Sequence, residues 1–276
     1  GAADRLGLNH TTIARRIENL ENALGGRVLT RGAVGWELTP LGRQAFAAGE
    51  RVEAAVRGLT ADVEGSAAAI TGAVRMSATD GFSAYIAAPA AVAVRRRHPG
   101  ISVEIVTATR SASHHRSGLD VEVVVGQPHV HRAEAIHLAD YVLGLYASRQ
   151  YLREHREPTT TAELVEHPLV YFVDAMLAVD DLDLARTMVP TMAESVTSTN
   201  VFVHVEATRA HAGVGLLPSY MADRHEDLVR VLPKVSARLG YWLVTRKEAL
   251  RRPEVAAVVD ALRVVAGASQ ERLLGG

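Results

Sequence analysis

A single amphipathic helix near the start of the chain constrains the fold more than any other feature of this sequence. Asn9 is a residue type that favours the capping position of a helix, and the turn before it contains Gly7. Behind this cap, apolar residues recur at the spacing of one helical face, at Ile13, Ile17, Leu20 and Leu24. A short helix ending at Leu6 precedes the turn. The pattern therefore predicts two helices joined by a tight turn, with the second helix docked through its apolar stripe.

The opposite side of the second helix is polar, and this arrangement leaves it open. It carries His10, Thr11, Thr12, Arg15, Arg16 and Asn19. Hydroxyl and guanidinium groups at such positions can donate hydrogen bonds to phosphates and to base edges in the major groove. A helix-turn-helix requires a helix with one apolar stripe that docks on the domain and an open polar face on the other side. The segment therefore predicts binding of double-stranded DNA.

A β-hairpin is predicted directly after this helix. Val28 and Leu29 are followed by a glycine-bearing turn over residues 32–35 and then by residues 36–38. Two short strands joined in this way form the wing of a winged helix-turn-helix. We expect Arg31, at the base of the wing, to contact the DNA backbone or the minor groove; an ordinary solvated arginine is the alternative.

A long helix with one apolar seam follows the hairpin. Thr39 is its predicted cap and Pro40 its first residue. Small or apolar side chains then recur at heptad spacing, at Ala45, Gly49, Val52, Val56, Leu59 and Val63. A seam this narrow favours pairing with one other helix, so residues 41–68 are predicted to form a dimerisation helix. Packing of this helix on the core of the same chain is the alternative.

From residue 69 onwards, strand and helix patterns alternate. Strands are expected near residues 74–78, 101–106, 119–125, 138–146, 169–172, 214–217 and 241–244, and helices near 82–97, 149–155, 161–166, 200–212 and 253–265. This alternation predicts an α/β domain with mainly parallel strands. The expected fold class is therefore multi-domain: an α-helical winged helix-turn-helix with a long linker helix, then a two-lobed α/β domain.

Composition limits the class of protein. The chain has 276 residues, of which 48% are hydrophobic, which is enough for more than one packed core. It contains no cysteine, so disulfides and thiolate metal sites are not expected and a reducing cytoplasm is the expected location. No apolar run approaches the roughly 18 residues of a membrane span, and no signal peptide is visible. The net charge of −1 argues against a polybasic surface, but it does not argue against DNA binding by a local patch.

The N-terminal segment resembles the DNA-binding domain of LysR-type transcriptional regulators. The positions that match the family pattern are Ala2, Ala3, Leu6, Asn9, Ile13, Ile17, Leu20, Glu21, Leu24, Gly25, Arg31, Leu38, Thr39 and Gly42. Three features depart from it: Ala14 stands where Ser is usual, Val28-Leu29 replaces Leu-Phe, and the chain opens without the first helix of the three-helix core. The resemblance implies a winged helix-turn-helix over residues 1–40 that is incomplete at its start.

The remaining chain resembles the effector-binding domain of the same family, whose fold is shared with periplasmic solute-binding proteins. Matching segments occur in the expected order, at residues 75–82, 89, 98–101, 120–126, 146–147, 167–168 and 213–218, while Glu122 stands where a small residue is usual. The resemblance implies an effector domain over residues 69–276, with two lobes joined by strands that cross near residues 144–147 and 243–246. Lobe I would comprise residues 69–146 and 246–276, and lobe II residues 147–245.

These expectations select candidate contact residues. For DNA they are Asn9, His10, Thr11, Thr12, Arg15, Arg16 and Arg31. The cleft between the lobes is the expected effector site, because open α/β sheets bind ligands where strands end and helices begin. The segments that match the effector contacts of the family supply Thr79, Asp80, Phe82, Thr109, Arg110, Gln127, Ser198, Thr199 and Asn200. Asp80 suits an anionic ligand poorly, and capping of its own helix is the alternative role.

Other polar clusters predict no additional site. Six histidines fall close together, at positions 98, 114, 115, 129, 131 and 137, but their spacing fits no familiar set of metal ligands. The acidic group Asp180, Asp181 and Asp183 is interpreted as a solvated loop. The sequence carries no nucleophile elbow, no phosphate-binding glycine loop with lysine and no zinc-hydrolase helix motif. We therefore expect no catalytic residue, no metal and no cofactor.

The combined expectation is a sequence-specific bacterial transcription regulator of the LysR type, modulated by a small-molecule effector. The resemblance implies that the effector is a carboxylate or an aromatic acid, and that homodimers formed through the linker helix pair into homotetramers. The heptad seam by itself supports only the dimer. No membrane association is expected. The alternative is a stand-alone solute-binding or sensor protein with a vestigial DNA-binding segment.

Overall fold

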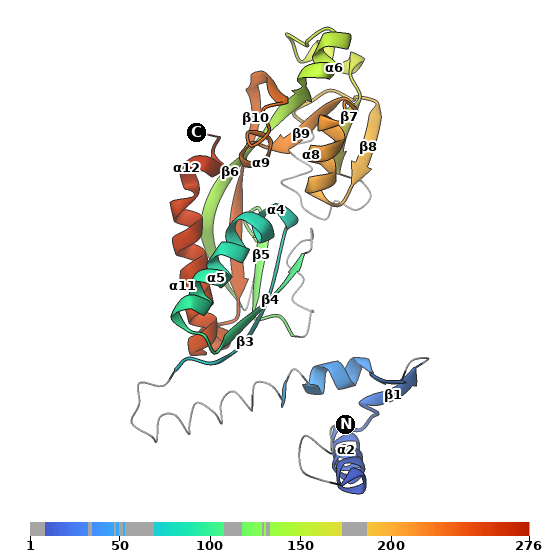
Figure 1. Ribbon diagram of the computed structural model, residues 1–276, viewed down its shortest axis with the longest axis vertical. Coiled ribbons are helices and arrows are strands. Elements are labelled where there is room, and N and C mark those ends of the chain that lie inside the picture. The colour runs from blue at the N-terminus through green and yellow to red at the C-terminus, as the bar shows by residue number, and fades with distance from the viewer. Residues whose placement is uncertain are drawn as a thin grey trace. The chain divides into compact units, whose positions relative to one another are not determined.

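The chain divides into two compact units, Gly1–Ala69 and Ile70–Gly276 (Figure 1). The computed structural model describes residues 9–32, 35–46, 48–49, 52, 69–107, 118–128, 130, 133–172 and 187–275. Across these ranges, no helix combines the length and the apolar character needed to cross a lipid bilayer.

The helix α2, His10–Leu24, is the main element of the first unit. Asn9 caps it, because the side-chain oxygen of Asn9 accepts a hydrogen bond of 3.1 Å from the Thr12 amide. The helix ends at Gly25, which adopts the left-handed conformation with φ 69°. The predicted cap and the predicted helix are both confirmed.

The predicted wing is also confirmed. β1 (Leu29–Gly32) pairs antiparallel with β2 (Gly35–Leu38). Residues 40–46 are helical, and Thr39 caps this second helix, since its hydroxyl accepts a 2.9 Å hydrogen bond from the Gly42 amide. Most of the linker segment 41–68, including seam residues 56, 59 and 63, lies outside the described residues.

In the described part of the second unit, eight strands form one mixed sheet, in the order β4-β3-β5-β10-β6-β9-β7-β8. β3 is parallel to β4 and β5, and β7 is parallel to β8 and β9. The central strand β10 is antiparallel to both neighbours, so the expectation of mainly parallel strands holds in the outer parts of the sheet and is wrong at its centre. The strands are β3 (Gly72–Ala78), β4 (Ile101–Thr107), β5 (Val121–Val125), β6 (Glu134–Ser148), β7 (Leu169–Phe172), β8 (Glu194–Ser198), β9 (Val214–Pro218) and β10 (Leu228–Thr245).

The long strands β6 and β10 connect the two lobes, because each of them runs through both (Figure 1). In the first lobe, the Tyr241–Thr245 part of β10 pairs with β5. In the second lobe, the Leu143–Tyr146 part of β6 pairs with β9. The lobes therefore share a two-stranded connection.

β10 begins well before the strand that the sequence predicted. The early half contains Pro233, which lacks the amide hydrogen that a central strand needs. The structure accommodates this proline in an irregularity of the β6–β10 register between Val231 and Ser236, where Leu232 takes a positive φ of 46°. Because of this bulge, the sequence pattern does not indicate the early half of the strand, although the strand continues through the bulge.

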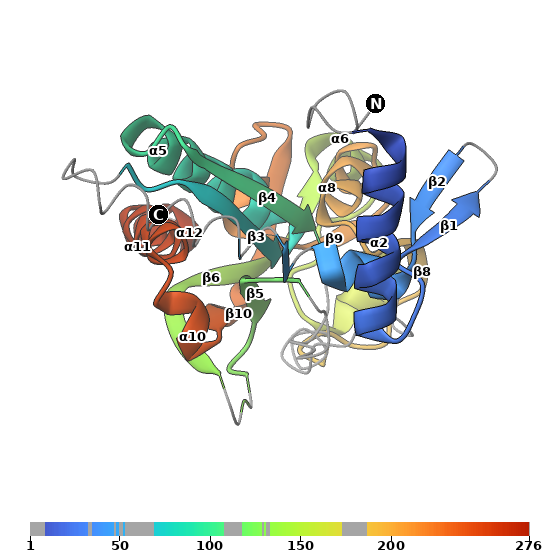
Figure 2. The ribbon, with the colours of Figure 1, turned by 90° about the horizontal axis from the view of Figure 1, so that it is seen from below.

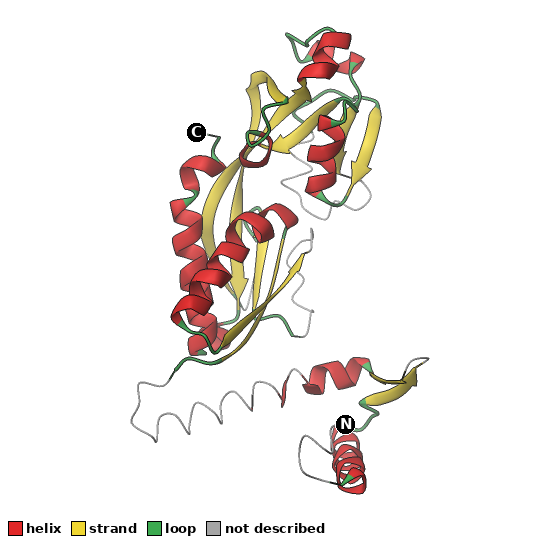
Figure 3. Cartoon of the chain, in the orientation of Figure 1, coloured by secondary structure: helices red, strands yellow, loops and turns green. Residues whose placement is uncertain are grey.

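Helices cover the sheet in both lobes (Figure 3). In the first lobe, α4 (Asp80–Phe82) continues through a π-helical turn, Ser83–Ala87, into α5 (Ala88–Arg97). The π-turn ends two residues before Pro89, whose ring cannot fit a regular α-helical hydrogen-bond ladder. The other helices are α6 (Arg149–Glu154), a 3-10 turn (Ala162–Glu166), α8 (Val201–Arg209), α9 (Ser219–Ala222), α10 (Lys247–Leu250), α11 (Pro253–Ala268) and α12 (Gln270–Leu273).

The core of the first lobe lies between the sheet and the helices α5 and α11, which pack side by side (Figure 2). Val258 and Leu262 on one face of α11 are almost completely buried, as are Phe82 and Ile86 on the helix that follows β3. This packing holds the C-terminal end of β3, and the turn into α4, in a fixed position at the edge of the interlobe space.

Candidate DNA-binding surface and effector site

The polar face of α2 is open to solvent. Thr11, Arg15 and Arg16 are exposed, Thr12 is half-buried and His10 is the first residue of the helix. The side-chain oxygen of Asn9 accepts the capping hydrogen bond, so only the NH2 group of the Asn9 side chain is left to contact DNA. The described part of α2 thus presents two guanidinium groups outward within its first two turns, together with the Thr11 hydroxyl, which donates to the Asn9 side-chain oxygen.

The opposite face of α2 is only partly covered by the described residues. Ile13 and Ile17 are half-buried and line a groove of about 780 Å³ together with Trp36 of the wing. Leu20 and Leu24 are 44% and 43% exposed, so the expectation that they are buried is wrong. The helical spacing assigned all four apolar residues to one interface, whereas only Ile13 and Ile17 are half-buried.

Glu21 fastens α2 to the wing. Its carboxylate accepts hydrogen bonds of 2.8 Å from the Val28 amide and 3.4 Å from the Leu29 amide. The same carboxylate lies 3.4 Å from the Arg27 guanidinium. Arg31 is exposed on β1, opposite Trp36 in the register of the hairpin. The position of Arg31 relative to α2 therefore depends on the bonds made by Glu21.

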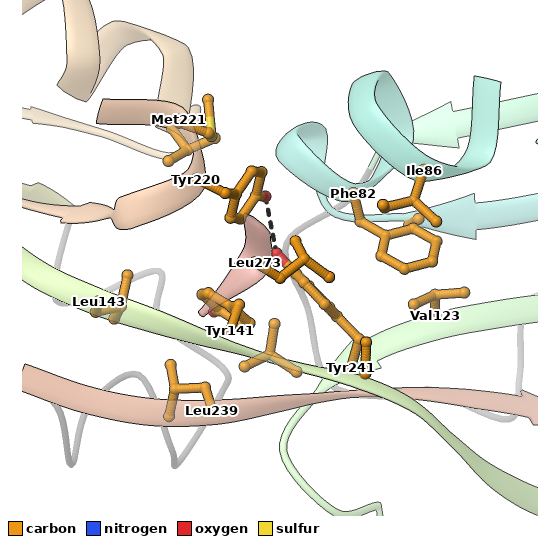
Figure 4. Close-up of a cluster of buried hydrophobic side chains, with 14 of the residues drawn as sticks. Phe82, Ile86, Val123, Tyr141, Leu143, Tyr220, Met221, Leu239, Tyr241 and Leu273 are labelled. Atoms are coloured by element: carbon orange, nitrogen blue, oxygen red, sulfur yellow. Dashed lines mark hydrogen bonds between the residues drawn. The ribbon is translucent and has the colours of Figure 1, made fainter. Parts of the chain in front are cut away.

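A small cavity of about 30 Å³ lies between the lobes of the second unit. Figure 4 shows Tyr141, Tyr220 and Tyr241 meeting there, with the dashed line marking the 3.0 Å hydrogen bond between the hydroxyls of Tyr220 and Tyr241. The lining residues are Thr79, Asp80, Gly81, Val125, Tyr141, Leu143, Phe172, Val201, Pro218, Tyr220 and Tyr241. The cavity is thus formed by the start of α4, by the crossing strands and by the elements that carry Phe172, Val201 and Tyr220.

The first-lobe candidates fall at or next to this cavity. Thr79 and Asp80 line it. Phe82 is completely buried beneath it, with its ring centre 4.9 Å from that of Tyr241. Gln127 is exposed and does not line the cavity. Thr109 and Arg110 lie outside the described residues, so their predicted role stays a prediction.

The second-lobe candidates occupy the start of α8. Asn200 caps this helix, because its side-chain oxygen accepts a 2.9 Å hydrogen bond from the Phe202 amide, and the Ser198 hydroxyl accepts one of 3.1 Å from the Asn200 amide. Neither these two residues nor Thr199 lines the cavity; the next residue, Val201, does. The expected loop is therefore adjacent to the cavity, and its polar groups serve the helix start.

Asp80 does not cap its helix. Thr79 precedes the first turn, and Asp80 is the first helical residue of α4. Burial of the Asp80 carboxyl group raises its pKa above the usual value, while a hydrogen bond with the Thr107 side chain acts in the opposite direction. The capping alternative is therefore not observed, and Asp80 lines the cavity.

The tyrosines are the cavity residues that the sequence did not predict. Tyr220 and Tyr241 are 2% exposed, and the Tyr141 ring stacks on Tyr241 with 4.4 Å between ring centres. Burial raises the pKa of Tyr241 to about 12, so its hydroxyl is neutral at physiological pH. Tyr141 and Tyr241 lie within strands, and Tyr220 lies two residues after Pro218. From the sequence, all three look like ordinary core residues. Only the pairing of β6 with β10 shows that two of them meet at the cleft.

The described residues include no group of three or more His, Asp or Glu placed to hold a metal ion. Of the six clustered histidines, those at 114, 115, 129 and 131 lie outside the described residues. Within the described part of the cluster, His137 pairs with Asp140 at 2.7 Å. The acidic group at 180, 181 and 183 also lies outside the described residues.

A winged helix-turn-helix with an open arginine-bearing face, in one chain with a two-lobed α/β domain that encloses a cavity, defines the class of ligand-responsive DNA-binding regulators. The chain belongs to the LysR family of bacterial regulatory proteins. Residues 1–43 match the bacterial regulatory helix-turn-helix protein model of the lysR family, and residues 67–266 match the LysR substrate binding domain. The resemblance seen in the sequence is confirmed, and the family is one of transcription regulators, not of enzymes.

Several proteins that are similar to this chain in sequence are named as transcription regulators. A transcriptional repressor of Pseudomonas aeruginosa is 29% identical over 151 residues, which are 55% of this chain and 48% of the repressor. CrgA of Neisseria meningitidis is 24% identical over 173 residues, 63% of this chain and 58% of CrgA. The activator TtdR of Escherichia coli is 23% identical over 275 residues, 95% of this chain and 86% of TtdR. The matched segment thus spans about half the length of the first two relatives.

Solved structures of the family share the fold. The virulence activator AphB of Vibrio cholerae aligns with a TM-score of 0.59 at 21% identity, covering 94% of this chain and 91% of AphB. CrgA of Neisseria meningitidis aligns with a TM-score of 0.63 at 18% identity, covering 96% and 92%. A full-length OxyR variant of Pseudomonas aeruginosa gives 0.65 at 16% identity, covering 96% and 89%. At these identities the likeness establishes architecture alone.

Proposed function

We propose that this protein binds a specific double-stranded DNA operator and regulates transcription from it. The exposed face of α2, with Thr11, Arg15 and Arg16, is the observation that carries this proposal. Side chains at the start of a recognition helix reach base edges, and one good bidentate contact discriminates between bases by about 1–3 kcal/mol. Arg31 on the wing and His10 at the helix start would add contacts that set the position of the unit on the duplex.

We further propose that a small molecule bound between the lobes controls this activity. The cavity touches both lobes, and β6 and β10 connect them, so a ligand that favours one lobe arrangement shifts the equilibrium towards it. Thr79 and Asp80 would contact the ligand; Thr109, Arg110 and the α8 start at Ser198, Thr199 and Asn200 are the further candidates. Coupling to DNA requires that the ligand bind the two arrangements with different affinity.

We propose the following assembly and division of the chain. Residues 1–40 would bind DNA, and residues 41–68 would pair two subunits into a homodimer, with homotetramers formed from two dimers. Residues 69–276 would bind the effector, in two lobes joined by the crossing strands. The heptad seam supports the dimer, and the family supports the tetramer. As a DNA-binding regulator, the protein would act in the cytoplasm.

A gel shift with DNA from the intergenic region next to the gene tests the proposed function. The protein should retard one fragment at concentrations that leave unrelated DNA of equal length unshifted, and a subset of added metabolites should alter that shift. Retardation of both fragments at the same concentration would show salt-dependent, non-specific binding only.

A second candidate is a stand-alone sensor with a vestigial DNA-binding segment. The exposure of Leu20 and Leu24 favours it, because an apolar stripe open to water weakens the packing of a recognition helix. Under this reading, small molecules stabilise the second unit while no fragment of genomic DNA is retained. The same gel shift therefore separates the two candidates.

A further inference from the structure

The cavity between the lobes has an unusual balance of charge. Its walls are mostly apolar, and the polar groups that line it are hydroxyls and the single carboxylate of Asp80. Among the lining residues in the described part of the chain there is no lysine, arginine or histidine. A ligand with a carboxylate would meet no opposite charge among these described residues, and it would face the negative group of an ionised Asp80.

The hydroxyls in the cavity offer more acceptor positions than donor positions. Each phenol has one hydrogen to donate and two lone pairs to accept. The Tyr220–Tyr241 bond of 3.0 Å uses one hydrogen, and Tyr241 also bonds with the side chains of Thr79 and Tyr141, so all three hydrogen-bonding positions of the Tyr241 hydroxyl are occupied. Both phenols are buried and neutral, and an ionised Asp80 can only accept. The acceptor positions that these bonds leave over belong to Tyr220 and Asp80, and they are suited to hydrogen-bond donors on a ligand.

The close approach of Tyr220 gives the cavity its size. A Cβ atom added at Gly81 would lie 2.4 Å from the Tyr220 hydroxyl oxygen, so this tyrosine reaches the backbone at the start of α4. The space of about 30 Å³ that remains corresponds to roughly two water molecules. The enclosed part of the cavity therefore suits a head group of a few non-hydrogen atoms.

We infer that the cavity binds a small head group that carries hydrogen-bond donors and no negative charge, of the amide or amidinium type. This inference rests on the proposed role of the second unit as the effector-binding domain and specifies the chemical class of the effector. Asp80 and the Tyr220 hydroxyl are the groups that select for donors. The inferred class differs from the carboxylate that the family resemblance implied.

Three isosteric probes test the inference: acetate, acetamide and acetamidinium. Each is added at millimolar concentration to the full chain, and binding is measured by thermal shift and by saturation-transfer NMR. We expect acetamidinium and acetamide to bind at least about tenfold more tightly than acetate, since one charge-assisted hydrogen bond or one unpaired buried group changes affinity by about that factor.

Matched variants locate the effect. Asp80→Asn should weaken acetamidinium about tenfold and remove the discrimination against acetate, whereas Asp260→Asn, at an exposed position on α11, should change neither. Tyr220→Phe removes the hydroxyl and keeps the ring, and it should weaken the binding of acetamide about 2- to 10-fold. Tyr151→Phe, at a buried tyrosine that bonds His167 instead of lining the cavity, is the control.

Three results would overturn the inference. They are equal or tighter binding of acetate by the wild type, no binding of either donor probe, and an Asp80→Asn variant with unchanged preference. Operator binding without any probe, measured on the same samples, reports on the proposed function independently. Retained DNA binding with acetate preferred would refute only the ligand class, and donor preference without DNA binding would refute only the regulator.

Discussion

Gly213 occupies a backbone position that a side chain would disturb. It has a φ of 140°, and a Cβ atom placed there would lie 2.2 Å from the carbonyl oxygen of Pro168. The glycine lets β9 start against the segment that leads into β7, since the Val214 amide donates a 2.8 Å hydrogen bond to that same oxygen. Pro168 and Gly213 therefore belong to one junction, which explains both short sequence motifs physically.

Replacement of this glycine should be costly. Gly213→Ala is expected to lower the free energy of unfolding by about 2–4 kcal/mol, because both the dihedral strain and the clash with Pro168 must be relieved. Urea denaturation of the wild type and the variant measures the loss. Gly267→Ala is the matched control: this helical glycine has nothing within 4 Å of an added Cβ, and the alanine should stabilise α11 by about 0.5–1 kcal/mol. Equal effects of the two substitutions would contradict the account.

His204 makes stability depend on pH. It is fully buried in α8, its Nε2 donates a 2.8 Å hydrogen bond to the Ser198 carbonyl oxygen, and its Nδ1 has no partner. Burial lowers the pKa of His204 below the ordinary value of 6.5. The native protein thus holds a neutral ring at a pH where the unfolded chain already binds a proton.

The sign of the effect follows from this difference. The stabilisation is fully present above about pH 6.5 and is lost as the pH falls from there towards the lower native pKa. The free energy of unfolding should therefore decrease on acidification from about pH 7.5 to about pH 5.5, and His204→Gln should reduce that decrease. His167, whose pKa is also lowered by burial, should account for part of the remainder. Parallel pH profiles for the wild type and His204→Gln would exclude this role.

Helix α2 and the wing act as one element because Glu21 joins them. The amides of Val28 and Leu29 both bond to its carboxylate, whereas the Arg27 partner is 83% exposed and contributes little. Glu21→Gln should cost about 1 kcal/mol of stability in the first unit and speed hydrogen exchange at the Val28 amide. Glu18→Gln, at an exposed position on the same helix, should leave that amide unchanged. Similar exchange rates in both variants would show that Glu21 does not hold the wing.

The sequence predicted most elements for identifiable reasons. The wing and α2 have glycine turns and caps at their ends. In β3, β4, β5, β7 and β9, apolar residues predominate or alternate with polar ones. β8 was missed because Glu194–Ser198 is polar at all but one position and lies at the edge of the sheet. β10 was predicted too short because its bulge contains Pro233.

The candidate site was only half predictable for a different reason. Thr79 and Asp80 follow a strand directly, so local pattern placed them correctly at the cavity. Tyr141 and Tyr241 reach it through the pairing of strands that are far apart in sequence, and Tyr220 through the turn after β9. No local signal distinguishes such residues from the ordinary core.

At the scale of the whole molecule, the chain consists of two compact units with different candidate sites. The first unit offers an arginine-bearing helix face, and the second offers a cavity that touches both of its lobes. Neither unit contains, within its described residues, a metal-binding cluster. The proposed regulation depends on both units, but the claim that the protein reads DNA depends on α2 alone.

The salt dependence of operator binding tests that claim most directly, and fluorescence anisotropy measures it. Three proteins are compared: the wild type, the double variant Arg15→Ala/Arg16→Ala, and the control double variant Arg153→Ala/Arg263→Ala. The control removes two exposed arginines from the second unit. The account predicts that the α2 variant loses at least about tenfold in affinity and that the slope of log K against log salt falls by about 1–2, while the control behaves as the wild type. Equal affinity and slope for all three proteins would contradict the assignment of α2 as the DNA-reading helix.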